Sequence, residues 1–172
     1  MKELEVQLTT PRGRAHLIFP EYTEIYEENI PAHIFQYTIL GAGYPYHHCF
    51  QKRRLQLSAF DGLWAGFLAT EHEADCALRL AWWRLFEPLD LEEGAAEGYR
   101  SYLRSRAGET LNFLQKRRDA TGLAQFLRWG KPSEADISQA AAEARAAGDT
   151  ESLALLLEAG HGGPKKKKDF TL

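Results

Sequence analysis

The sequence predicts an α+β protein, in which an N-terminal, mainly antiparallel β-sheet is followed by an α-helical half. Three observations lead to this prediction. Apolar residues alternate with a period of two near the N-terminus, their spacing becomes helical from residue 70 onward, and a segment near the C-terminus occurs twice, about 30 residues apart. The chain has 172 residues, of which 44% are hydrophobic and 12% aromatic, so it can form a hydrophobic core.

These patterns divide the chain into three parts. We expect a β-rich part at residues 1–69, a helical part packed on it at 70–106, and C-terminal helical repeats with a basic tail at 107–172. The β-rich part is predicted to contain about four or five strands in one small sheet.

Three strands of this sheet follow from local patterns. Glu3–Thr9 alternates apolar with polar residues, which predicts a half-buried strand. Pro11 and Gly13 then predict a turn, so Ala15–Phe19 is expected to return as the second strand of a hairpin. His33–Leu40 is rich in β-branched and aromatic residues and is the third expected strand.

The rest of the β-rich part is assigned from its turn residues and charges. Asp61-Gly62 lies between two apolar-aromatic runs, which predicts a second tight hairpin. The segment 41–50, GAGYPYHHCF, is expected to be a loop because of its Gly and Pro residues. A solvated connector between strands is expected to hold the glutamates Glu21, Glu24, Glu27 and Glu28.

The helical part begins where the spacing changes. Thr70 is a candidate N-cap, and the apolar residues from Ala74 to Phe86 then fall on one helical face. Pro88 is expected to end that helix, and Leu91–Arg106 is expected to form a second one.

The last third contains an internal repeat. DATGLAQFLRWG, Asp119–Gly130, aligns with DTESLALLLEAG, Asp149–Gly160, position by position. Each copy opens with an Asp suited to the N-cap and closes with a Gly suited to the helix C-terminus. Because another predicted helix precedes each copy, the sequence predicts two helical pairs in tandem.

These two helical pairs resemble ankyrin repeats, over about residues 107–172. The chain lacks the TPLHxA-like opening and the β-finger of that family. This part is also similar to C-terminal helical modules of proteins from Firmicutes and their mobile elements. The resemblance implies a surface for protein contacts without chemistry of its own. The alternative is that the helical pairs simply cover the open face of the sheet.

Candidate binding residues are basic or aromatic. Trp82 is assigned to the core, whereas Trp83 and Trp129 are candidate interface anchors. The basic candidates form four clusters: Arg12 and Arg14; Lys52, Arg53 and Arg54; Lys116, Arg117 and Arg118; Lys165, Lys166, Lys167 and Lys168. The last cluster follows glycines, from Gly160 onward, that are expected to stop the final helix. It either complements the helix dipole and adds solubility, or contacts phosphate or an acidic surface.

Cysteine and histidine residues raise the question of an enzyme. His48, Cys49, His72 and Cys76 could together bind zinc or provide a nucleophile, but their spacing matches no established zinc signature and no motif flanks them. The segment Gly41–Gly43 matches no phosphate-binding loop. We therefore predict no catalytic residues, no metal and no cofactor.

The overall charge and hydropathy limit the expected setting. The net charge of −3 gives no general electrostatic reason for binding nucleic acid or membrane. The sequence has no apolar run of about 20 residues, no apolar signal segment and only two cysteines, which predicts a cytoplasmic protein.

The resulting functional hypothesis is a non-catalytic interaction protein that binds a protein or a protein–nucleic-acid complex. A small chain with no catalytic motif and a repeat-like C-terminal part would suit a mobile-element inhibitor, for example an anti-CRISPR-like protein. The alternatives are a nucleic-acid-binding protein acting alone and a Cys/His, zinc-dependent enzyme.

Overall fold

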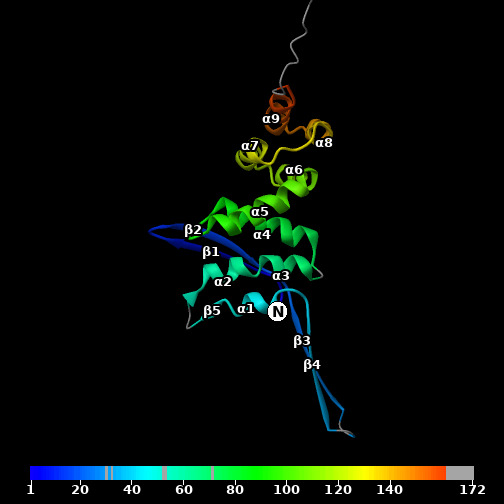
Figure 1. Ribbon diagram of the computed structural model, residues 1–172. Helices are drawn as coiled ribbons and strands as arrows, with labels where there is room; N and C mark the ends of the chain where they lie inside the picture. The colour runs from blue at the N-terminus through cyan, green and yellow to red at the C-terminus, as the bar shows by residue number, and fades with distance from the viewer. Residues whose placement is uncertain (30, 32, 52–53, 71, 162–172) are drawn as a thin grey trace, which may run out of the picture. The chain divides into compact units, whose positions relative to one another are not determined.

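The computed structural model describes residues 1–29, 31, 33–51, 54–70 and 72–161 (Figure 1). The chain forms two compact units, unit 1 at Met1–Tyr102 and unit 2 at Leu103–Leu172. Short antiparallel hairpins near the N-terminus are followed by helices, so the predicted α+β class is confirmed.

Within the described residues, the strands form three separate two-stranded sheets, so the prediction of one sheet of four or five strands was wrong. The antiparallel pairs are β1 (Leu4–Thr10) with β2 (Gly13–Phe19), β3 (Thr23–Asn29) with β4 (Ile34–Leu40), and β5 (Phe50–Gln51) with β6 (Arg54–Leu55). Strand β2 packs against helix α4 (Ala74–Phe86).

The first hairpin agrees with its prediction. All residues of β2 from Ala15 to Phe19 are buried, whereas Val6 and Leu8 of β1 are half-buried, as period two requires. Burial of apolar surface of β2 against a helix contributes about 25 cal/mol per Å².

The acidic segment before β4 is a strand and not the expected connector. Glu24, Glu27 and Glu28 lie in β3, which pairs with β4 along its whole length. The prediction failed because cross-strand partners such as Tyr26 and Tyr37, whose ring centroids lie 4.6 Å apart, offset the low strand propensity of glutamate.

The second predicted hairpin, at Asp61-Gly62, is also wrong, because two short helices occupy this region. They are α2 (Leu57–Gly62) and α3 (Trp64–Ala69). Leu57, Phe60, Trp64 and Phe67 recur every three or four residues, and all four are buried. That spacing is helical, and it prevails over the local turn signal. Part of the expected loop 41–50 is likewise helical, in α1 (Tyr44–His47).

A buried ionic network joins α2, α4 and α5 (Glu93–Ser105). Arg84 is 0% exposed, and its Nε and Nη2 donate to the two carboxylate oxygens of Asp61 at 2.8 and 2.9 Å. The hydroxyl of Tyr99 donates to the same carboxylate at 2.9 Å, and Arg84 also donates to the carbonyl of Leu89 at 2.8 Å. Asp61 is therefore held in the core by its partners and does not form a turn.

The ends of α4 differ in part from the prediction. Thr70 does not cap this helix, because its hydroxyl donates to the carbonyl of Phe67 at the end of α3. Glu73 occupies the N-cap of α4 without a side-chain hydrogen bond. The helix ends at Phe86, before Pro88, as expected.

Unit 2 contains the two predicted helical pairs. They are α6 (Ala107–Lys116) with α7 (Ala120–Trp129), and α8 (Glu134–Ala146) with α9 (Thr150–His161). Helix α6 also contacts α8, and α7 contacts α9, so the pairs stack in register. Asp119 and Asp149 accept hydrogen bonds from backbone N–H groups three residues on, at 2.8 and 3.1 Å, which confirms both as N-caps.

The two glycines expected to end these helices behave differently. Gly130 has a φ of −71°, and Lys131 adopts the left-handed conformation instead, with a φ of 50°. Gly160 lies within α9, so it does not stop the final helix. The remaining stop residues and the lysines from 165 to 168 lie outside the described residues.

Candidate functional site

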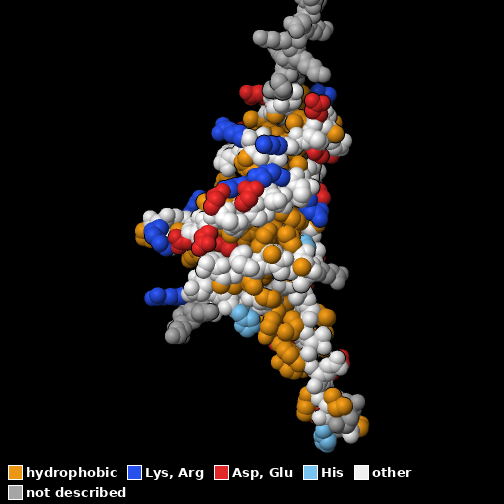
Figure 2. All heavy atoms as spheres, in the orientation of Figure 1, with side chains coloured by type: hydrophobic (Ala, Val, Ile, Leu, Met, Phe, Trp, Pro, Cys, Tyr) orange, Lys and Arg blue, Asp and Glu red, His pale blue; other side chains and the backbone are white. Residues whose placement is uncertain are grey.

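The β3–β4 hairpin exposes large hydrophobic side chains on both of its faces. Tyr26 and Phe35 are 75% and 74% exposed, and Ile34 is 60% exposed. Figure 1 shows the hairpin extending away from the helices of unit 1, and Figure 2 shows hydrophobic side chains gathered along it. An isolated two-stranded hairpin is at best marginally stable in water. Such a surface is typical of one that a partner covers.

The strand register places the aromatic residues on one face. Tyr26 lies opposite Tyr37, and Glu28 lies opposite Phe35, so these side chains share one side of the hairpin. The hydroxyl of Tyr37 donates to a carboxylate oxygen of Glu24 at 2.8 Å. We call Tyr26, Phe35 and Tyr37 the aromatic face. Tyrosine and phenylalanine side chains are common anchors at the centre of protein interfaces.

The hairpin is also strongly acidic. Glu24, Glu27 and Glu28 lie in β3, and Glu21 precedes it. The sequence from Ala15 to Gln51 contains no lysine or arginine. The aromatic face is therefore bordered by negative charge that no basic side chain of the hairpin offsets, and it suits a positively charged surface.

Glycine residues fix the base of the hairpin. The N–H of Gly43 donates to the carbonyl of Glu21 at 3.1 Å, and a Cβ at Gly43 would lie 1.8 Å from the carbonyl oxygen of Pro20. Gly41 has a φ of +93°, which L side chains rarely adopt. The GAG segment thus allows two stretches of backbone to cross closely, and this crossing holds the start of β3 against the end of β4.

The predicted basic residues of unit 1 are partly engaged in ion pairs. Arg12 contacts Asp90 at 2.6 Å, and Arg14 contacts Glu87 at 3.2 Å. Arg54 is exposed, whereas its predicted neighbours Lys52 and Arg53 lie outside the described residues. The first cluster is consequently less positive than the sequence suggests.

In unit 2, Lys116, Arg117 and Arg118 are exposed at and just beyond the end of α6. The guanidinium of Arg117 lies over the Phe113 ring, 5.6 Å from its centroid. Arg118 adopts a left-handed conformation with a φ of 53°.

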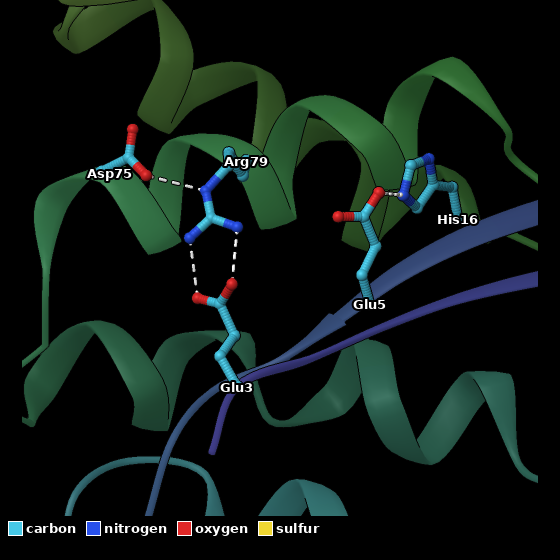
Figure 3. A network of polar contacts seen from close by, with 5 residues as sticks. All are labelled: Glu3, Glu5, His16, Asp75 and Arg79. Carbon is cyan, nitrogen blue, oxygen red and sulfur yellow. Dashed lines mark hydrogen bonds and ion pairs between the residues drawn. The ribbon is translucent and has the colours of Figure 1, made fainter.

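The two candidate tryptophan anchors are both half-buried within their own units. Trp83 stacks on His16 with ring centroids 4.2 Å apart, and His16 contacts Glu5 at 2.5 Å (Figure 3). Trp129 packs edge-on against Phe126, and Arg104 lies 5.9 Å from its ring centroid. Each tryptophan side chain therefore packs in part against residues of its own unit.

The Cys and His residues do not form a metal centre among the residues that the structure describes, where no group of three or more His, Cys, Asp or Glu side chains is arranged to hold an ion. Cys49 and Cys76 are both buried. Burial raises the pKa of Cys49 to about 11 and that of Cys76 to about 12. Both thiols are therefore protonated near neutral pH, which does not suit a nucleophile.

This burial makes a prediction about thiol chemistry. At about pH 8, roughly one Cys49 side chain in a thousand would be a thiolate, and fewer at Cys76. We expect iodoacetamide to leave both thiols of the native protein unmodified and to label both after unfolding in urea, as read by intact mass. Rapid labelling of the native protein at Cys49 would contradict this and would revive the nucleophile hypothesis.

The aromatic face is the feature that sequence reasoning missed. Its signal was present in TEIYEEN and IFQYTIL, whose alternating residues carry aromatic side chains on one side once the two segments are paired.

No described helix is long and apolar enough to cross a bilayer. No protein-family model matches the chain, and no curated protein or solved structure matches it.

Proposed function

We propose that this chain is a non-catalytic interaction protein, and that its β3–β4 hairpin docks on a basic surface of a partner protein. The observation that carries the proposal is the aromatic face, whose tyrosine and phenylalanine side chains are exposed to solvent within an acidic surround. Aromatic side chains dominate the energetics of many interfaces, and charge complementarity sets the choice of partner.

The charge of the hairpin favours a different protein over a second copy of this chain. Pairing two hairpins through their aromatic faces would bring Glu24 and Glu28 of each copy together, with no lysine or arginine between Ala15 and Gln51 to offset them. Like charges in such positions are destabilising. A partner that carries lysine and arginine would remove this repulsion and would gain on-rate from electrostatic steering.

Proteins that bind nucleic acids have basic surfaces of this kind. The expectation of a mobile-element inhibitor would fit a hairpin that covers such a surface. The stacked helical pairs of unit 2, with the ankyrin-like character expected from the sequence, would add further protein contacts.

The test compares captures from a bacterial lysate by three baits, each with and without nuclease treatment. These are the wild-type protein, the double variant Tyr26→Ser/Phe35→Ser on the aromatic face, and Ile34→Ser on the opposite face. We expect the partner's yield to fall about tenfold or more with the double variant and to change little with Ile34→Ser. Circular dichroism checks that all three remain folded.

Binding of the captured partner to the purified protein should then weaken as salt is raised, because the contact is electrostatic in part. Equal capture by the double variant would refute the hairpin as the docking site. A partner that is lost on nuclease treatment would instead favour nucleic-acid binding through the exposed cluster Lys116, Arg117 and Arg118.

A further inference from the structure

A cavity of about 440 Å³ lies in unit 1, beside the base of the β3–β4 hairpin and the start of α4. Its volume is in the range of small-molecule sites. Its lining residues include Glu3, Glu21, Glu73, Phe67 and His72. The glycine crossing at Gly41 forms another part of the wall.

Two of these glutamates, Glu21 and Glu73, leave the cavity lining with an excess of negative charge. Glu3 is held by Arg79, whose two guanidinium nitrogens donate to its two oxygens at 2.6 and 2.7 Å (Figure 3). These hydrogen bonds lower the pKa of Glu3, so it is ionised at neutral pH. Within the described part of the chain, no ion pair engages Glu21 or Glu73.

The hydrogen-bonding groups of the wall are largely acceptors. Nδ1 of His72 lies 2.7 Å from the carbonyl oxygen of Thr70, so this nitrogen carries the hydrogen. In the neutral ring, Nε2 is then an acceptor. The thiol of Cys76, which also lines the cavity, directs its hydrogen to Glu3.

An aromatic wall completes the site. The rings of Phe67 and His72 pack with centroids 4.6 Å apart, and both line the cavity. Phe67 is 3% exposed and its ring also stacks on Trp64, with centroids 5.7 Å apart, so this pair gives the wall a firmly held apolar surface. The acceptors, the negative charge and the aromatic surface all suit one kind of ligand, a positively charged group that only donates hydrogen bonds.

We propose that this cavity binds an organic cation, an alkylammonium or alkylguanidinium group. A metal ion fits less well, because the described residues hold no ligand group for one, and the volume suits an alkyl chain with its head group. The cation could belong to a free amine or to a lysine or arginine side chain of a docked protein. The proposal does not depend on the function proposed above, because the cavity could bind a free amine without a partner.

The test titrates the full-length protein with matched probes at constant ionic strength, followed by isothermal calorimetry and by NMR shifts. We expect n-butylammonium and n-butylguanidinium to bind saturably, and n-butanol and butyrate not to bind. Zinc and calcium are included as competing cations. Binding of n-butanol as strong as that of n-butylammonium, or displacement of n-butylammonium by zinc or calcium at stoichiometric amounts, would overturn the proposal.

Two pairs of variants locate the binding. Glu21→Gln/Glu73→Gln should weaken butylammonium binding by about tenfold or more, because two charge-assisted contacts are lost. Glu27→Gln/Glu28→Gln removes the same charge from the hairpin and should leave binding within about twofold. If both pairs weakened butylammonium binding equally, the cation would be attracted by the overall negative charge and not by a specific site.

Two further measurements are needed. One identifies whether the cation is a free amine or a protein side chain, and the other tests the cavity separately from the hairpin. Putrescine represents a free amine, and N-acetyl-lysine methylamide represents a protein side chain, so the tighter of the two identifies the source. Tyr26→Ser/Phe35→Ser should lower partner capture about tenfold or more yet retain butylammonium binding. Failure of the cavity and failure of the hairpin would therefore be seen independently.

Discussion

Replacement of Arg84 by methionine is expected to destabilise unit 1 by about 3–5 kcal/mol. The guanidinium is fully buried and donates to Asp61 through two nitrogens and to two backbone carbonyls, of Glu87 and Leu89. Without it, the carboxylate of Asp61 remains in the core with only the Tyr99 hydroxyl as a hydrogen-bond donor in that network. An uncompensated buried charge is among the most destabilising changes in a protein.

Urea unfolding of the full chain, followed by far-UV circular dichroism and tryptophan fluorescence, measures this loss. The matched control is Arg84→Met/Asp61→Leu, which removes both charges and should recover at least half of the stability lost in the single variant. A loss below about 1 kcal/mol for Arg84→Met, or full additivity with Asp61→Leu, would show that the ion pair contributes little.

Replacement of Gly43 by alanine is expected to cost about 3 kcal/mol or more, because the new Cβ would meet the carbonyl oxygen of Pro20 at 1.8 Å. The obstacle is backbone, so no side chain can rotate away. Gly43 has a φ of −80°, an ordinary value for alanine, so the expected loss is purely steric. Thermal unfolding of the full chain measures it.

Gly66→Ala is the control for this substitution. Gly66 lies within α3, and a Cβ there would meet nothing within 4 Å. Alanine should therefore stabilise the protein by about 0.5–1 kcal/mol, through the higher helix propensity of alanine. Similar effects of Gly43→Ala and Gly66→Ala would contradict the close backbone crossing at the base of the hairpin.

Local signals predicted those parts of the fold that depend on neighbours in sequence. The β1–β2 hairpin, the end of α4 before Pro88 and the N-caps Asp119 and Asp149 follow from residues a few positions apart. Asp61-Gly62 misled because the carboxylate of Asp61 is bound by Arg84, which the sequence does not place beside it. A long-range ionic contact thus overrode a two-residue turn signal.

The candidate site could not be predicted for a related reason. The aromatic face exists only once β3 pairs with β4 in the observed register. The sequence did not predict β3 as a strand, because it contains glutamates, which have a low strand propensity. The basic clusters were visible in the sequence, but their partners were not, since Asp90 and Glu87 lie far along the chain from Arg12 and Arg14. Composition shows where charges are, whereas the fold decides which of them are neutralised.

The lysine- and arginine-free stretch around the hairpin has a consequence for mass spectrometry. Trypsin cleaves after lysine and arginine, so it leaves β2 from Ala15 onward, both strands of the hairpin and the glycine crossing on one peptide, from Ala15 to Lys52. Amine-reactive cross-linkers find no lysine between these ends. Carboxylate-directed reagents have Glu21, Glu24, Glu27 and Glu28 as targets there, and a lysine of a bound protein would be joined to that single peptide.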